Sequence, residues 1–161
     1  SDLDRVEIEV GDGLLEIRQG SLVSGLFSMN ESRGNVMVKV IASELQAVAS
    51  SSGANADLIH ITCTDLHVDA SSGSRIEVSG SCDTVAIDAS SGANVDSSDL
   101  ITTEASVESS SGATIRVFAS ESFRGDASSG SSIRVYGSPE ATESEMSSGA
   151  SIDLRSHTEM I

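Results

Sequence analysis

Apolar and charged residues alternate in short segments that recur along the chain, each one following a Ser-Ser-Gly triplet. The third and fifth residues after each glycine are mostly Ala, Ile, Val or Leu, and the residue between them is always charged. Those charged residues are Asp57, Glu77, Asp96, Arg116, Arg134 and Asp153. Alternation with a period of two is typical of a strand with one buried and one exposed face. The pattern therefore predicts a half-buried strand after every triplet.

The triplets themselves set the repeat. Their glycines are Gly53, Gly73, Gly92, Gly112, Gly130 and Gly149, at successive spacings of 20, 19, 20, 18 and 19. A second apolar alternation precedes each triplet, with an inward position three residues before the first serine. Those positions hold Val48, Val68, Ile87, Val107, Gly125 and Ser144. Because the last two are small or polar, we expect the strand before the triplet to be loosest in the last two coils.

Two strands in each repeat, in phase with their counterparts, indicate stacked coils with parallel strands. No two-residue Asn-Gly or Asp-Gly turn joins the strands as a hairpin would require. Ser-Ser-Gly is then the corner between strands, where glycine tolerates positive φ and small serines let corners stack about 4.8 Å apart. The serine hydroxyls of such a column are expected to bond to one another and to the backbone. No segment predicts a helix, so the fold class is all-β.

The first 44 residues carry the pattern less regularly. The segment Val6 to Ile17 alternates around Gly11, Asp12 and Gly13 and predicts a hairpin, and Gly34 stands one repeat before Gly53 in a degenerate corner. We expect one β-helical domain over residues 1–161. Residues 1–44 form imperfect coils and an amino-terminal cap, 45–155 form the regular coils, and 156–161 form a carboxy-terminal tail.

The repeated "SSGA" corners, together with "IRVYGSP" from Ile133 to Pro139, resemble the head GIN domain of bacterial autotransporter adhesins. The resemblance covers residues 3–155 and implies a right-handed parallel β-helix (solenoid) with coils of about 18–20 residues. The right hand also agrees with the general bias of parallel crossovers. The family implies a location on the outside of a bacterial cell, outer-membrane or lipid anchored, and a role in adhesion. The family usually has further strands before "DRVEIEVGDGLLEI", so the resemblance predicts an incomplete amino-terminal cap in this sequence.

The charge balance narrows the set of partners. Nine basic and 25 acidic residues give a formal net charge of -16, which repels the phosphates of nucleic acid and anionic lipid surfaces. No apolar stretch is long enough to span a bilayer. The expected partner is therefore a surface protein, a glycan or a second copy of the chain, with no nucleic acid and no membrane-spanning segment.

One outward column is acidic. Two residues before each triplet stand Ala49, Asp69, Asp88, Glu108, Asp126 and Glu145. Neighbouring carboxylates repel, and a divalent cation such as Ca²⁺ would relieve the repulsion. No loop carries the Gly-Gly-x-Gly-x-Asp pattern of calcium-loaded coils. The simpler interpretation, which we prefer, is a solvated stripe, so no metal ligand or cofactor is assigned.

Cys63 and Cys82 lie one repeat apart, and each stands eight residues before a triplet. They should therefore lie one above the other, within the Cα distance range of disulfides. An exported location permits oxidation, but two stacked free thiols fit the same column. The absence of a Cys-x-x-Cys motif argues against zinc.

No residue set predicts catalysis. His60, His67 and His157 lack a repeated partner, and no Gly-x-Ser-x-Gly elbow is present. The one outward gathering of aromatic and cationic groups places Phe118 over Tyr136 beside the stacked pair Arg116 and Arg134. It is either a binding contact of the kind that favours aromatic and Arg residues or an aromatic cover of the coil edge.

Three functions follow from these observations. We favour a non-enzymatic cell-surface or secreted adhesin-like module that presents repeated polar faces for binding. The first alternative is a carbohydrate-active enzyme or lectin on the same scaffold. The second is a self-assembling surface protein whose coils continue end to end.

Overall fold

A computed structural model of the chain describes residues 6–11, 14–19 and 45–155. The chain divides into two compact units, residues 1–41 and 42–161. In the described part all regular structure is β. The division of residues 1–161 into one domain with a cap and a tail stays a prediction.

The first unit contains a hairpin. Strand β1 (Val6–Gly11) pairs antiparallel with β2 (Leu14–Gln19), and Ile8 lies opposite Ile17. Two residues separate Gly11 from its partner Leu14, as in the shortest β-hairpins. The hairpin predicted around Gly11 is therefore confirmed. The degenerate corner at Gly34 lies outside the described residues.

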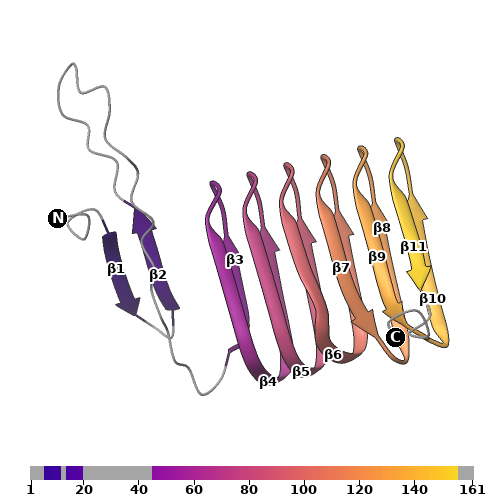
Figure 1. The fold of residues 1–161 in the computed structure, drawn as a ribbon, viewed down its shortest axis with the longest axis horizontal. Helices are drawn as coiled ribbons and strands as arrows, with labels where there is room; N and C mark the ends of the chain where they lie inside the picture. The colour runs from indigo at the N-terminus through magenta and orange to yellow at the C-terminus, as the bar shows by residue number, and fades with distance from the viewer. Residues whose placement is uncertain (1–5, 12–13, 20–44, 156–161) are drawn as a thin grey trace. The chain divides into compact units, whose positions relative to one another are not determined.

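The second unit is a parallel β-solenoid of about six coils, shown in Figure 1, which we number 1 to 6 by their corner glycines. Its strands are β3 (Ala47–Ser50), β4 (Asn55–Ala70), β5 (Arg75–Ala89), β6 (Asn94–Ser109), β7 (Thr114–Ala119), β8 (Ser122–Ala127), β9 (Ser132–Gly137), β10 (Ala141–Met146) and β11 (Ser151–Arg155). Every pairing among them is parallel and joins one coil to the next.

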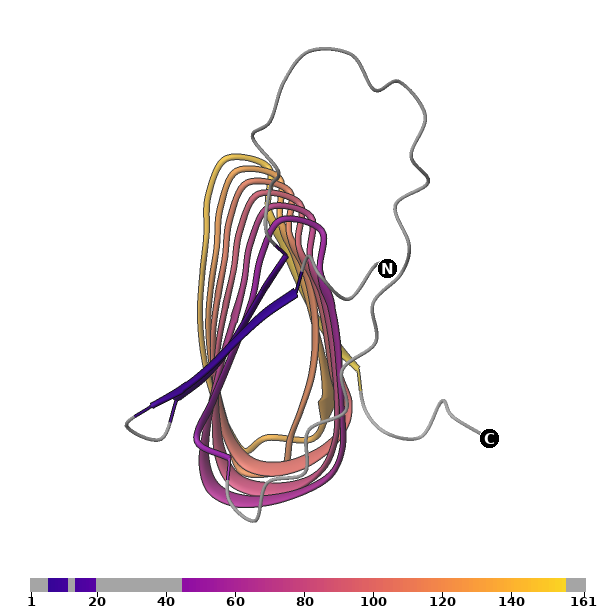
Figure 2. The same ribbon diagram turned by 90° about the vertical axis from the view of Figure 1, so that its left-hand side faces the viewer.

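Each coil has two faces, a corner and a bend. The post-corner face contains the strand segments that follow the triplets, and the pre-corner face contains those that lead into them. The long strands β4, β5 and β6 pass through the bend and contribute to both faces, whereas in later coils each face has its own strand. As the coils advance from left to right in Figure 1, the post-corner strands descend in front and the pre-corner strands ascend behind, which Figure 2 shows end-on. The winding is right-handed, as expected.

The core consists of stacked columns of aliphatic side chains between the two faces. The column three residues after glycine holds Ile76, Val95, Ile115 and Ile133, all with 0% exposure and each in register with the next. From the pre-corner face Val68, Ile87 and Val107 meet them, at most 1% exposed. Burial of branched aliphatic residues on a pleated surface favours strands, so the same alternation builds both the strands and the core.

The Ser-Ser-Gly corners are tight turns with two left-handed residues. In each, the second serine has φ between 50° and 56° and the glycine φ between 72° and 76°. The N–H of the next residue donates to the carbonyl of the first serine, as Ala113 does to Ser110 at 3.0 Å. Positive φ at both central positions is the requirement of a type I′ turn. The turn is the one used in hairpins, but the strands that it joins pair with neighbouring coils.

The side-chain bonds inside the corners come from serines that flank the triplets. The hydroxyl of Ser74 donates to the Ser50 carbonyl of the preceding coil at 2.8 Å, and Ser131 donates to Ser109 at 2.8 Å. Where the residue before the triplet is alanine, as at Ala70, Ala89 and Ala127, the facing residue of the next coil is also alanine. Ser therefore faces Ser and Ala faces Ala. In the described part, the hydroxyls within the triplets make no such bond, contrary to expectation.

The predicted loosening of the last two pre-corner strands is half right. In coil 5 the Phe123 ring is 2% exposed and fills the space beside Gly125, where a Cβ would overlap it. That strand is therefore well packed. In coil 6 every residue of β10 is exposed, as is the apolar Leu154 of β11, because no further described coil covers this end of the solenoid.

Candidate functional faces

The pre-corner face presents the acidic column. The carboxylates of Asp69, Asp88, Glu108, Asp126 and Glu145 stand in register on successive strands. They border a shallow hollow of ≈490 Å³ beside the corner serines. Among the described residues no group of three or more His, Cys, Asp or Glu side chains is arranged to hold a metal ion. The column predicted from the sequence is confirmed as a column, with one acidic side chain in each of coils 2 to 6 and Ala49 in coil 1.

A second hollow of ≈580 Å³ crosses the same face nearer the bend. Its floor is low because Ala86 and Ser106 project from the sheet where other coils carry longer side chains. On its walls the Thr84 hydroxyl donates to the Asp65 carboxylate at 2.5 Å, and Arg124 donates to Glu143 at 3.1 Å. The hollow therefore has polar side chains on its walls, with Leu66, Val85 and Phe123 among the residues that line it, and suits a partner that projects into it.

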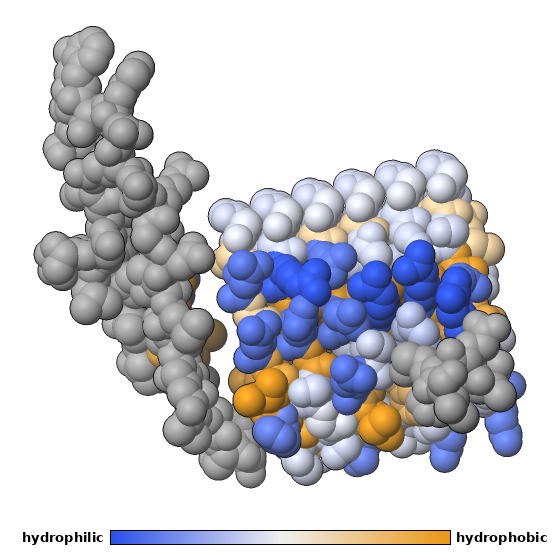
Figure 3. Space-filling model, viewed as in Figure 1, coloured by the Kyte–Doolittle hydropathy of each residue, from blue (hydrophilic) through white to orange (hydrophobic). Residues whose placement is uncertain are grey.

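The post-corner face carries a band of charged side chains, visible as the blue stripe below the pale corners in Figure 3. Arg116 bonds to Asp96 at 3.2 Å, and Arg155 bonds to Asp153 at 2.8 Å. Arg75 pairs with Glu77. The hydrogen bond to the Glu77 carboxylate, and then its negative charge, raise the pKa of Arg75. The arginines thus neutralise acidic neighbours along the band, as expected for opposite charges on adjacent positions.

Two adjacent strands of this face bring the aromatic and cationic side chains together. In the pairing of β7 with β9, Phe118 lies opposite Tyr136, and Arg116 lies opposite Arg134. All four side chains are partly exposed. This arrangement confirms the stacking predicted from the repeat. Asp153 lies opposite Arg134 on β11, but Asp153 bonds to Arg155, and among the described residues Arg134 makes no salt bridge of the kind that Arg116 makes.

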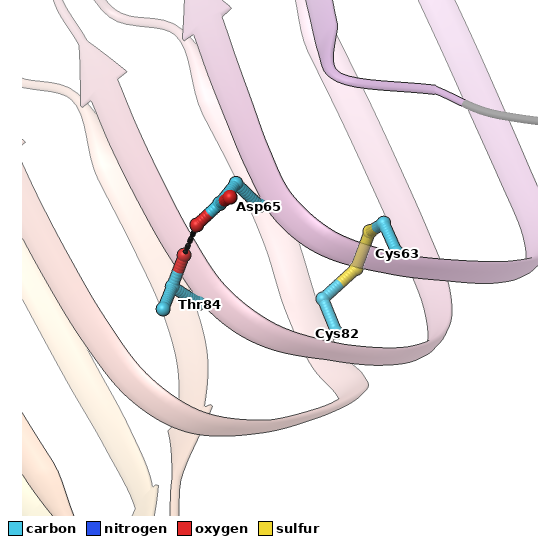
Figure 4. Close-up of a disulfide and its surroundings, with 4 residues drawn as sticks. All are labelled: Cys63, Asp65, Cys82 and Thr84. Carbon is cyan, nitrogen blue, oxygen red and sulfur yellow. Dashed lines mark hydrogen bonds between the residues drawn. A yellow bond between two sulfur atoms is a disulfide. The ribbon is translucent and has the colours of Figure 1, made fainter.

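The two cysteines form a disulfide at the bend. Cys63 of β4 and Cys82 of β5 are bonded, with their Cα atoms 4.6 Å apart, and Figure 4 shows the bridge between the two strands. Of the two alternatives for this pair, the structure has the bridge. It joins the bend of β4, the first bend of the described solenoid, to a better buried neighbour, because Cys63 is partly exposed and Cys82 is buried.

The two described histidines lie in different parts of the coil. His67 approaches Asp88 at 3.6 Å on the exposed pre-corner face, and both side chains are about half exposed. His60 lies in the bend with a positive φ of 57°. His157 lies outside the described residues. Of the two described histidines, His67 is therefore a surface residue and His60 a bend residue.

Together these features define a class of protein: a right-handed parallel β-solenoid whose two faces carry in-register rows of side chains. The described residues include no helix long and apolar enough to cross a membrane. The chain belongs to the family described as "putative auto-transporter adhesin, head GIN domain", whose model matches residues 1–139.

Among solved structures, the chain is similar to a putative adhesin from Bacteroides fragilis. The two share 12% identity with a TM-score of 0.66, over 95% of this chain and 78% of that one. At this identity the similarity supports the fold. No protein with a curated description matches the chain.

Proposed function

We propose that the chain is a non-enzymatic head module of a bacterial cell-surface adhesin, which binds its partner through the side faces of the solenoid. Membership of the adhesin head family carries the proposal. The family also supports a location at the cell surface or outside the cell, where a disulfide such as Cys63–Cys82 persists.

The architecture suits this role. The strands are paired from coil to coil without a break, so the faces are stiff and their side chains are fixed in rows one strand spacing apart. A stiff array loses little conformational entropy when it binds an extended partner, and repeated weak contacts add through avidity. The described faces carry no nucleophile, base and orienting group in mutual contact.

The test is adhesion by the full chain. Beads coated with the chain should bind saturably to at least one member of a panel of host glycans and surface proteins, and beads coated with heat-unfolded chain should not. A chain that fails to bind any member at bead-surface avidity would contradict an adhesive role. Release of shorter products from any panel polysaccharide would contradict the non-enzymatic part.

The hollow near the bend favours a second candidate, carbohydrate binding on the pre-corner face. Its walls offer Asp65, Thr84, Glu104 and Glu143, which are acceptors and donors of the kind that sugar hydroxyls use. If the partner is a glycan seated there, Ala86→Trp should fill the hollow and abolish bead binding. The matched change Thr114→Trp on the opposite face should leave it unaltered.

A further inference from the structure

The patch formed by Arg116, Phe118, Arg134 and Tyr136 is unusual on a chain with a net charge of -16. Arg134 makes no salt bridge among the described residues, because its neighbour Asp153 on β11 bonds to Arg155, and Arg116 uses one N–H group on Asp96. Neither of the two hollows on the pre-corner face includes any of the four residues. Aromatic and Arg side chains on a flat surface are the composition of protein–protein hot spots rather than of small-molecule pockets.

The complement of this patch lies on the other face of the same molecule. Glu108 and Asp126 stand on adjacent strands there, as Arg116 and Arg134 do on the post-corner face. Both pairs are one parallel strand spacing apart, about 4.8 Å. Next to them, Ser106 and Arg124 line the hollow near the bend.

The two sets also lie at the same depth below the corner. Arg116 is four residues after Gly112, and Glu108 is four residues before it. Phe118 and Ser106 are six residues from the same glycine, in opposite directions. The same counts from Gly130 relate Arg134 to Asp126 and Tyr136 to Arg124. With about 3.3 Å per residue, the charged residues of both faces lie about 13 Å from the corner. Phe118 and Tyr136 on one face, and Ser106 and Arg124 on the other, lie about 20 Å from it.

We propose that a second copy of this chain docks on the patch, with the post-corner face of one solenoid against the pre-corner face of the next and their axes parallel. Arg116 then faces Glu108 of the other copy, and Arg134 faces Asp126. Phe118 enters the hollow over Ser106, and Tyr136 lies against the Arg124 guanidinium in a cation–π contact. The contact uses different surfaces on the two copies, so it continues into a row of solenoids side by side.

The flanking coils limit the strength of this contact. In the same alignment Asp96 faces Asp88, Glu77 faces Asp69, and Asp153 faces Glu145, which are all like charges. Arg116, Arg75 and Arg155 each hold one member of those pairs and reduce the repulsion. Exposed ion pairs contribute little individually. We therefore expect association in the range of about 0.1–1 mM in solution, which becomes effective at the high local density of a cell surface.

Complementation between two variants of the full chain tests the arrangement. The first variant, Arg134→Ser with Tyr136→Ser, loses the patch and keeps the pre-corner face. The second, Glu108→Lys with Asp126→Lys, loses the acidic surface and keeps the patch. Circular dichroism verifies that both fold, and sedimentation velocity up to about 1 mM chain at 0.15 M salt measures association. Thr114→Ala, two residues from Arg116 on the same strand, is the matched control.

The wild-type chain and the Thr114→Ala control should sediment faster as concentration rises. Each double variant alone should remain monomeric, although the second has a lower net charge and less general repulsion. An equimolar mixture should form a 1:1 complex that grows no further. Each variant has one intact docking surface, and the complex uses both of them. A monomeric wild type, a self-associating double variant or a monomeric mixture would each overturn the proposal.

The competing occupant of the patch is a carboxylated glycan. A wild type that stays monomeric and binds polygalacturonate beads through Arg134 would assign the patch to that ligand instead. The adhesion assay described above is separate from sedimentation. Failure of self-association therefore leaves the proposed adhesive role unaffected.

Discussion

The corner and the bend of each coil solve the same problem, reversing the chain, in different ways. All six corners have the same residues and the same pair of positive φ values. The bends differ in length. The register between β4 and β5 shifts between Leu58 and Ile61, where the chain enters the bend. The register between β5 and β6 shifts in the opposite direction between Glu77 and Ser79. Differences in coil length are therefore absorbed at the bend.

The difference teaches where the repeat is encoded. A turn with two left-handed residues accepts few sequences, so the corner repeats visibly and fixes the register of the strands beside it. The bend has no fixed turn and depends on local contacts instead. A Cβ at Gly80 would overlap the Ile61 carbonyl oxygen, and a Cβ at Gly137 would overlap that of Ala119. Glycine at the bend is required by close approach, and glycine at the corner by backbone conformation.

The largest effect should come from Gly80→Ala in the bend. The new methyl group meets backbone atoms of Ile61 on the neighbouring strand, and φ is 135°, which L-residues rarely adopt. We expect a loss of roughly 3–4 kcal/mol in the free energy of unfolding, measured by urea denaturation.

Gly112→Ala at a corner is the matched control. Nothing lies within 4 Å of a Cβ there, so only the left-handed conformation at φ 74° is penalised, by about 1–2 kcal/mol. Equal losses at the two positions would show that close approach at the bend does not distinguish them.

The sequence predicts the corner-proximal part of the fold well for the same reason. Alternation around each triplet gives the strands, their parallel order and the inward and outward columns, including Phe118 over Tyr136. It misses the positive φ of the second serine, because serine is not a residue that signals this conformation. It also misreads Gly125, because the filling of its space by the Phe123 ring depends on a rotamer that no spacing reveals.

The next largest effect is expected from loss of the disulfide at the bend. Reduction of Cys63–Cys82, or Cys63→Ser with Cys82→Ser, removes the only disulfide of the chain and releases the bend of β4 from that of β5. A bridge over a loop of this size stabilises a protein by about 3 kcal/mol in the chain-entropy model. We expect the free energy of unfolding to decrease by that amount or somewhat less. The bend of β4 is partly exposed, and its local opening requires less free energy than global unfolding. Thermal unfolding with and without a reductant measures it, and an unchanged midpoint would contradict the role of the bridge.

A smaller effect, of opposite sign, is expected from Ser111→Asn at a corner. Ser111 has φ 51°, its side chain is exposed, and asparagine tolerates the left-handed region better than serine. The change creates the Asn-Gly pair that type I′ turns prefer. We expect a gain of about 0.5 kcal/mol and a rise of about 1–2 °C in Tm. Ser110→Asn, one residue earlier and outside the left-handed pair, should give no gain. A loss of stability at Ser111 would refute the strain at the corner.

The candidate faces were less predictable than the fold. Stacking of like residues follows from the period, so the acidic column and the Arg pair were expected. The hollow near the bend arises where Ala86 and Ser106 interrupt a row of longer side chains. That is a difference between coils, which an alignment that stresses their likeness does not show. The disulfide was undecided because residues in register fit a bridge and a pair of thiols equally well.

The smallest effect is expected from calcium. The carboxylates of Asp69, Asp88, Glu108, Asp126 and Glu145 are one per coil, spaced by about 4.8 Å on an exposed face. Ca²⁺ requires six to eight oxygen ligands at about 2.3–2.6 Å, and a single row of side chains one strand apart does not surround an ion. Millimolar Ca²⁺ should therefore change Tm by less than about 1 °C relative to EDTA, the same as Mg²⁺ at equal ionic strength. A rise of several degrees with Ca²⁺ alone, lost in Glu108→Gln with Asp126→Asn, would mean that the column gathers into a site instead of remaining a solvated stripe.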